Sequence, residues 1–177
     1  MAYDLSKLGD VNTERTIPDG SEVTAVLAGP AEAKTTPNGS PFVECEYQVR
    51  GGTFDSWKLR LPIWTNQTVK PDSKSGKSAF DIATITLANM YRGYFYVPEA
   101  NYAKGKETPE SAAKRAPYVG KMNQFFGVVQ DDNGLAKKVS QFVGKPITLK
   151  VSVKPDKNNV PRNEIAGFVP VKVPAPA

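Results

Sequence analysis

Aromatic and basic side chains alternate with apolar ones between residues 54 and 64 of the sequence. In a β-strand, alternate side chains point to the same face, so a strand here would present the aromatic and basic set together. With two residues from the preceding segment, the predicted face carries Phe42, Arg50, Phe54, Lys58, Arg60 and Trp64. Aromatic rings stack on the bases of a single-stranded nucleic acid, and cations pair with its phosphates. The pattern therefore predicts a surface that binds a single-stranded nucleic acid.

A second interpretation of this face stays open. Phe54 and Trp64 could instead pack beneath the helical segment that follows them in the chain. Glu44 and Glu46 fall on the same face and bring negative charge that opposes a polyanion. Trp57 falls on the opposite face with the apolar residues of its strand, which favours a place in the core.

Other segments carry candidates for the same chemistry. The run from Tyr91 to Tyr96 would line a groove, or would plug the core at a helix end. Lysines in the polar segments 66–77 and 98–116 would close over a bound strand, or would simply be solvated. Together with basic residues of two predicted loops, these candidates are Lys34, Tyr91, Arg92, Tyr94, Lys104, Lys106, Lys154, Lys157 and Arg162.

The composition argues against an enzyme. The chain has no histidine and a single cysteine, Cys45, which excludes a structural zinc site and every triad that uses imidazole as the base. The segment Ser75–Ser78 resembles the end of a phosphate-binding P-loop, but Pro71 stands where the first glycine belongs. The pair Asp131-Asp132 belongs to a sequence of ordinary turn composition. We expect no catalytic residue, no metal and no cofactor.

Length and composition favour one domain with short extensions. The chain has 177 residues and a mass of 19.2 kDa, with 40% hydrophobic and 23% charged residues, a globular balance. This length allows a core without metal or disulfide bonds. We expect a domain over residues 20–169, with a helical insertion at about 78–143. An N-terminal arm (1–19) and a proline-rich tail (170–177) would flank it.

Charge and hydropathy indicate the compartment and the type of partner. The net charge is +5, and residues 1–66 carry 6 Lys or Arg against 9 Asp or Glu, whereas residues 67–177 carry 17 against 9. A basic half suits a polyanion, although a solvated lysine-rich surface explains the same numbers. The N-terminus lacks a signal-peptide pattern, and no apolar run approaches the ~18 residues of a membrane span. We expect a cytoplasmic protein without a membrane partner.

Alternation and turn residues predict five strands. The first covers 21–34 and is interrupted at Gly29-Pro30, as in a long strand that either bulges or bends to serve two sheets. Gly51-Gly52 predicts a two-residue hairpin turn between the second and third strands. The remaining strands are predicted over residues 42–50, 57–64, 147–153 and 163–169.

Helices are predicted between the third and fourth strands. Ser78 and Asp81 form a capping-box sequence ahead of residues at helical spacing. Pro117 is predicted to open a second helix, and a turn at Asp131-Asp-Asn-Gly134 precedes a short third one that ends at Gly144. The fold class is therefore mainly β with a helical insertion. We expect a five-stranded OB-type Greek-key barrel, with a split β-sandwich as the rival architecture.

The order of several features resembles that of small OB-fold single-stranded-DNA-binding proteins from bacteriophages. These features are Ile17-Pro-Asp-Gly20, Glu32-Ala-Lys34, the turn at Asn38, the segment Phe42–Arg50, and Val143-Gly-Lys-Pro-Ile-Thr-Leu-Lys-Val151. The resemblance covers most of residues 17–170. It implies binding and protection of single-stranded DNA during phage DNA replication or recombination, in the cytoplasm of the host cell. Replication or recombination proteins would be its partners.

Residues and resemblance together predict a non-enzymatic protein that binds single-stranded DNA largely without sequence preference. The alternative from another class is a structural or interaction protein, such as a virion component or a host-factor inhibitor, on a β-sandwich. Two points stay open at this stage: RNA in place of DNA as the ligand, and a homo-oligomeric state.

Overall fold

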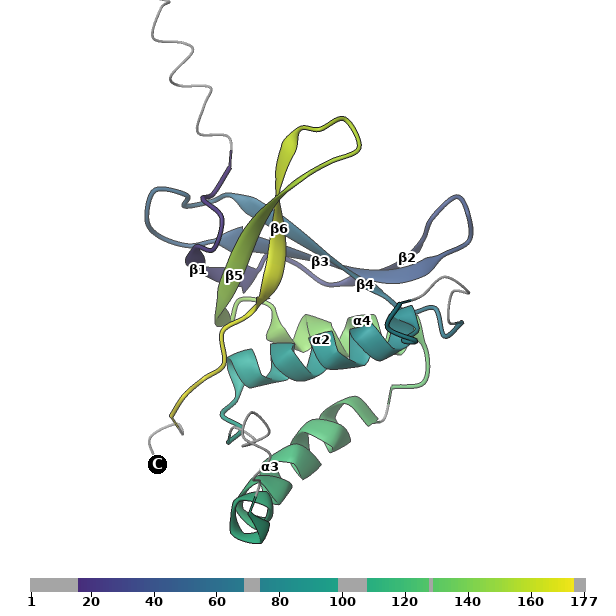
Figure 1. The fold of residues 1–177 in the computed structure, drawn as a ribbon, viewed down its shortest axis with the longest axis vertical. Coiled ribbons are helices and arrows are strands. Elements are labelled where there is room, and N and C mark those ends of the chain that lie inside the picture. Colours follow the sequence, from purple (N-terminus) through teal and green to yellow (C-terminus); the bar gives the residue numbers. More distant parts are fainter. Residues whose placement is uncertain (1–15, 69–73, 99–107, 128, 174–177) are drawn as a thin grey trace, which may run out of the picture.

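The computed structural model describes residues 16–68, 74–98, 108–127 and 129–173. In this part of the chain six strands form one antiparallel sheet, and three α-helices lie below it in Figure 1. The strands are β1 (Glu22–Leu27), β2 (Glu32–Thr35), β3 (Pro41–Val49), β4 (Lys58–Trp64), β5 (Pro146–Pro155) and β6 (Pro161–Phe168). The helices are α2 (Ala79–Tyr94), α3 (Pro109–Gly127) and α4 (Asp132–Val139), and the short 3₁₀ helix η3 (Ser140–Phe142) follows α4. None of the helices in the described ranges combines the length and apolar character that crossing a membrane requires.

Strand β3 organises the sheet, because three other strands pair with it. β4 runs along one edge, from the pair Phe42–Trp64 to the pair Gln48–Lys58. β1 and β2 share the opposite edge, β1 beside the end of β3 and β2 beside its start. On its other side β1 pairs with β5, which pairs with β6. β6 lies close to β4, but no backbone pairing joins them among the described residues, so the sheet is open.

The predicted first strand is divided into β1 and β2 at Gly29-Pro30. Pro30 has no N–H to offer a neighbouring strand. The N–H of Ala31 is also unavailable for pairing with a neighbouring strand, because it donates a hydrogen bond to Ser140 Oγ at 2.9 Å. Both parts remain on the same edge of β3, so the break serves one sheet, and of the two alternatives the bend between two sheets is wrong.

The connection between β3 and β4 is a loop over residues 50–57, not the predicted two-residue turn. Gly51 and Gly52 have φ values of 80° and 73°, which glycine adopts readily because it lacks a Cβ. The carboxylate of Asp55 accepts a hydrogen bond from the Gly51 amide at 2.6 Å and so stabilises the loop. Phe54 lies in this loop and not on the face of β4, and its predicted place on that face is wrong.

The capping sequence at Ser78 places the start of α2 where it was predicted, whereas α4 begins at Asp132, inside the segment that was predicted to be a turn before it. Ser78 Oγ accepts a hydrogen bond from the Asp81 N–H at 3.1 Å, and the Asp81 carboxylate accepts one from the Ser78 N–H at 2.8 Å. The Ser78 N–H and the Ser78 hydroxyl, at 2.9 Å, both donate to the Asp81 carboxylate, and these two hydrogen bonds lower the pKa of Asp81 because they stabilise its ionised form. Asp131 caps α4 by accepting a hydrogen bond from the Gly134 N–H at 2.6 Å.

Helix α3 begins at Pro109 and not at Pro117, which was predicted to open it. Thr108 Oγ1 accepts a hydrogen bond from the Ser111 N–H at 3.1 Å. Pro109 takes the first helical position, where the missing N–H leaves no hydrogen bond unmade. Pro117 lies inside the helix. The second half of the predicted polar loop over residues 98–116 is therefore helical.

Alternate residues of β3 form the centre of the core. Val43, Cys45, Tyr47 and Val49 are each at most 1% exposed, and Met90 of α2 belongs to the same buried cluster. Burying a large apolar side chain contributes about 1.5–3 kcal/mol, so this row binds the sheet to the helices. Burial also raises the pKa of Cys45 to about 12, and the thiol is therefore protonated at neutral pH.

Burial and hydrogen bonds attach residues near both ends of the described chain to the domain. Ile17, assigned to the arm by the sequence analysis, is fully buried. The side chain of Asn163 accepts a hydrogen bond from the Ile17 N–H at 2.7 Å and donates one to the Ile17 carbonyl at 2.8 Å. Val171, assigned to the tail, donates its N–H to the Arg92 carbonyl at the end of α2 at 2.8 Å. The other residues of the arm and tail, 1–15 and 174–177, lie outside the described residues.

We expect Gly93→Ala to destabilise the protein, because Gly93 lies where α2 crosses β5. A Cβ at this position would lie 2.6 Å from Ile147 Cδ1 and 3.0 Å from Ile147 Cγ1. Ile147 is 3% exposed and has little room to move. Gly120→Ala on α3 is the matched control, because a Cβ there meets no atom within 4 Å.

Both substitutions gain about 1 kcal/mol of helix propensity. Urea unfolding should therefore give Gly93→Ala a free energy of unfolding about 1–3 kcal/mol below that of Gly120→Ala, as for overpacked cores. Equal values for the two variants would contradict the close contact between α2 and β5.

Candidate nucleic-acid interface

An aromatic pair lies at one end of the outer face of β3 and β4. Phe42 and Trp64 are directly opposite each other in the antiparallel register, with ring centroids 4.7 Å apart. Trp64 is 40% exposed, and Phe42 is half-buried. The pairing continues past Pro62 without a register shift, so Trp64 stays on the face of Lys58 and Arg60, as the alternation predicted. β4 pairs on one edge only, where a proline is tolerated.

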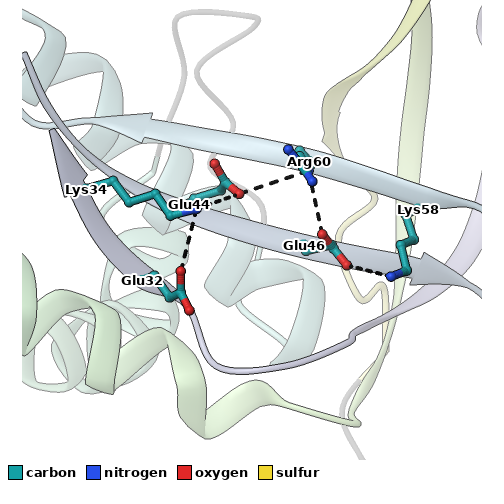
Figure 2. A network of polar contacts seen from close by, with 6 residues as sticks. All are labelled: Glu32, Lys34, Glu44, Glu46, Lys58 and Arg60. Atoms are coloured by element: carbon teal, nitrogen blue, oxygen red, sulfur yellow. Dashed lines mark hydrogen bonds and ion pairs between the residues drawn. The ribbon is translucent and has the colours of Figure 1, made fainter. Parts of the chain in front are cut away.

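Three carboxylates and three cations form a connected network on the same face (Figure 2). We call this network the charge ladder, and its members are Glu32, Lys34, Glu44, Glu46, Lys58 and Arg60. Its nitrogen–oxygen distances range from 3.2 to 4.0 Å. The formal charges of the ladder cancel, so the cations predicted to bind phosphates already have carboxylate partners.

The ion pairs of the ladder are accessible to solvent. Lys34 Nζ donates a hydrogen bond to Glu44 at 3.2 Å, and this hydrogen bond raises the pKa of Lys34. Exposed ion pairs of this kind contribute about 0–1 kcal/mol each. A phosphate group can therefore compete with Glu44 for the ammonium group without a large loss of stability.

Phe54 and Arg50 lie at the other end of these strands, off the outer face. Phe54 packs edge-on against Trp57 with ring centroids 5.1 Å apart, and both rings are partly buried against the core. Arg50 is exposed and makes no ion pair within the described residues. Of these two predicted residues, Arg50 alone is open to a phosphate.

Of the two placements that the sequence left open for Tyr91 and Tyr94, the structure shows the one in the core and not the one along a groove: Tyr91 is buried, and Tyr94 is partly buried against the core. Tyr91 is 8% exposed and contacts the rings of Phe125 and Phe126 on α3. Tyr94 stacks on Phe142 with ring centroids 4.2 Å apart. Burial raises the pKa of Tyr94 to about 12. Helical spacing turns both tyrosines toward these rings, so neither is available to a base.

Arg92 adds little to the outer face, because it belongs to α2 and not to the sheet. Arg92 is half-buried at the end of α2, where its carbonyl accepts the hydrogen bond from Val171. Its guanidinium Nε is buried without a hydrogen-bond partner in the described structure. Lys104 and Lys106 lie outside the described residues.

The β5–β6 hairpin carries the remaining predicted cations, and its tip projects away from the helices (Figure 1). Lys154 pairs with Glu164 at 3.5 Å, and Arg162 Nε pairs with Asp156 at 3.2 Å. Lys157 is exposed and makes no ion pair among the residues that the structure describes. Of these three predicted cations, Lys157 therefore has no carboxylate partner among the described residues, and the other two have one.

Asp156 shapes the tip of this hairpin. Its carboxylate accepts hydrogen bonds from the amides of Val160 at 3.0 Å and Asn158 at 2.8 Å, and Asn159 between them has a φ of 61°. These backbone hydrogen bonds, with a smaller effect from Arg162, lower the pKa of Asp156. The ionised carboxylate thus holds the loop that presents Lys157.

A second group of rings and cations lies on the helical side, where the sequence analysis did not place one. Phe95 is 38% exposed, and Lys145 Nζ lies 5.9 Å from the centroid of its ring. Lys138 Nζ lies 4.6 Å from the centroid of the Phe125 ring. The buried ring of Phe142 contacts both phenylalanines. No sequence period links these positions, so only the tertiary fold could reveal the group.

Two observations bear on metal and small-molecule sites among the described residues. These residues include no group of three or more His, Cys, Asp or Glu side chains that could hold a metal ion. A cavity of about 490 Å³ lies between α2, α3 and α4, and its lining contains no titratable side chain. Apolar residues such as Leu87 and Met122 form most of its wall.

We expect the hairpin tip to lose its order as the pH falls below the usual range of a carboxyl group. Because the pKa of Asp156 is lowered in the folded state, its ionised form stabilises the tip above the ordinary value of 3.8 and loses this effect below it. NMR titration of the Asn158 and Val160 amides should report a midpoint below 3.8. Asp156→Asn should abolish the titration, and a midpoint at or above the ordinary value would contradict the proposed hydrogen bonding.

Comparison with known proteins places no further constraint on this geometry. No protein-family model matches the sequence, and no curated protein matches it either. The exposed aromatic pair and the cations around it therefore carry the functional interpretation.

Proposed function

We propose that this protein binds single-stranded DNA, largely without sequence preference, and protects it during phage DNA replication or recombination. The observation that carries the proposal is the exposed pair Phe42–Trp64 on the outer face of β3 and β4. A solvent-facing indole can stack on any base, and one such stack contributes about 1–3 kcal/mol. Lys34 lies opposite Phe42 on β2, so a cation adjoins the aromatic pair.

We also propose an OB-type barrel as the architecture. If β1 and β2 count as one bent strand, the first strand pairs with β3 and β5, β3 pairs with β4, and β5 pairs with β6. The helices lie between the third and fourth of these strands. OB-folds share this order and bind nucleic acids across their second and third strands and the loops between strands 1–2 and 4–5. The proximity of β6 to β4 supports a partly open barrel.

The phosphates would be bound by cations around the outer face. Arg50 and Lys157 would be the first, because no carboxylate pairs with them among the described residues. Lys58 and Arg60 would contribute less per phosphate, because each must first give up a carboxylate partner. Binding in this mode needs neither a cofactor nor a catalytic group. The protein would act in the cytoplasm of the host cell, alongside replication or recombination proteins.

A second candidate function is that of an interaction protein, and helix α2 provides an observation in its favour. Phe80, Ile82 and Ile85 are 45%, 53% and 47% exposed. Exposed apolar side chains that gather on one element often mark a contact surface for another protein. Failure of the chain to bind any oligonucleotide would favour this candidate.

Binding should favour single strands over duplex, because only unpaired bases offer their faces to Trp64. Gel shifts and fluorescence anisotropy with labelled oligo-dT, oligo-rU and a duplex of equal length measure this preference. The logarithm of the affinity should fall with the logarithm of the salt concentration at a slope of about −0.7 per neutralised phosphate. Equal affinity for duplex, or binding without any salt dependence, would refute the proposal.

The two tryptophans provide a matched pair of variants. Trp64→Ala should weaken oligo-dT binding by about 1–3 kcal/mol, the loss of one stack, and should leave the melting temperature nearly unchanged. Trp57→Ala should instead lower the free energy of unfolding by about 3 kcal/mol, because its ring packs against the core. Thermal melts and fluorescence titrations of both variants test this division. If Trp64→Ala destabilises the fold and leaves binding intact, the aromatic pair is a packing feature only.

A further inference from the structure

Two carboxylates lie between the cations of the proposed binding face. We infer that Glu44 and Glu46 are specificity-determining residues: they occupy the cations of the charge ladder and so make binding depend on base stacking at Phe42 and Trp64. This inference rests on the proposed function, because it names what restricts the ligand at that same face.

Each of the two carboxylates contacts two cations. Glu44 Oε1 lies 3.2 Å from Lys34 Nζ and 4.0 Å from Arg60 Nε. Glu46 lies 3.2 Å from Lys58 Nζ through one oxygen and 3.5 Å from Arg60 Nε through the other. Arg60 thus lies between Glu44 and Glu46 (Figure 2). Removal of these two carboxylates would release Arg60 and Lys58 and would leave Lys34 with Glu32 alone.

The carboxylates are held more firmly than the cations. The side chains of Glu44 and Glu46 are 21% and 31% exposed, against 70% for Arg60. Both glutamates stand on β3, the strand that is paired along both of its edges. A phosphate can therefore reach the cations from solvent, but it cannot displace the negative charge beneath them.

The effect of the two carboxylates on DNA binding can be measured through the counterions that the DNA releases. A phosphate neutralised by a protein cation releases a counterion from the DNA. When that cation leaves Glu44 or Glu46, the freed carboxylate attracts a cation from solution, and the net release falls toward zero. The ladder thus gives little affinity to a ligand that offers only phosphates, as a duplex does. A single strand still gains the stacking energy at Phe42 and Trp64.

The test compares two double variants with the same change in net charge. E44Q/E46Q removes the two carboxylates of the ladder. E22Q/E110Q removes two exposed carboxylates on β1 and α3 that make no ion pair within the described residues. Because glutamine matches glutamate in shape and the ladder ion pairs are exposed, both proteins should fold, and thermal melts check this.

Relative to the control, E44Q/E46Q should bind oligo-dT roughly three- to tenfold more tightly at low salt, the range expected when the weak competing ion pairs of two carboxylates are removed. Its salt slope should steepen by about 0.7–1.4, one or two phosphates more. Its affinity for duplex should rise by a larger factor than its affinity for oligo-dT, so that the preference for single strands falls. The single variant E46Q should give an intermediate slope.

Equal affinities, slopes and preferences for E44Q/E46Q and E22Q/E110Q would overturn the inference and assign the ladder to stability alone. In that case the proposed function still stands if the wild-type protein binds oligo-dT and this binding depends on Trp64. If the wild-type protein and both double variants bind neither oligo-dT nor duplex, the proposed function fails and the inference fails with it. Binding of duplex by E44Q/E46Q alone would support the inference.

Discussion

The alternating burial of β3 is the constraint on which the other features depend. Val43, Cys45, Tyr47 and Val49 fill the core, and the residues between them face outward. A slip of one residue in the pairing would turn Glu44 and Glu46 into the core, and burying carboxylates without partners costs several kcal/mol each. β3 therefore has one stable register with β4 and with the β1–β2 edge. The pair Phe42–Trp64 and the charge ladder are both consequences of that register.

The electrostatic character of the surface follows from the same register. On the outer face, cations of β2 and β4 lie next to carboxylates of β2 and β3, and their charges cancel. Cations without a carboxylate partner among the described residues lie around this face or on the helical side, as Arg50, Lys157, Lys138 and Lys145 do. If the proposed function holds, the cancelled charges at the centre of this face would make stacking more important than charge for binding there.

The helical layer depends on aromatic contacts more than on regular packing. Phe142, which is 1% exposed, touches Tyr94 of α2 and Phe125 of α3. Aromatic pairs of this kind contribute about 0.5–1.5 kcal/mol beyond the area that they bury. The stack on Phe142 accounts for the partial burial of Tyr94, which the sequence analysis placed either along a groove or in the core. The ring of Phe142 also contacts Phe95, and Lys145 Nζ lies 5.9 Å from the centroid of the Phe95 ring.

By itself, the sequence determined the features that depend on neighbours within a few residues. Alternation assigned Cys45 to the core and Trp64 to the outer face, and the capping box at Ser78 located the start of α2. The span of the helical insertion, between the third and fourth predicted strands, was likewise predictable. The missed start of α3 at Pro109 is a local signal too, since Thr108 and Pro109 are typical of a helix N-terminus.

The tertiary structure alone decided which distant groups meet. The sequence shows that Glu44 and Arg60 could share a face, but their ion pair depends on the register between β3 and β4. The burial of Tyr91 depends on where α3 lies, and the packing of Phe54 depends on the length of the loop after β3. Such contacts join residues far apart in the chain, and they are stabilised by the packing of the whole core. Local propensity and periodicity carry no information about that packing, because each describes only a short stretch of chain.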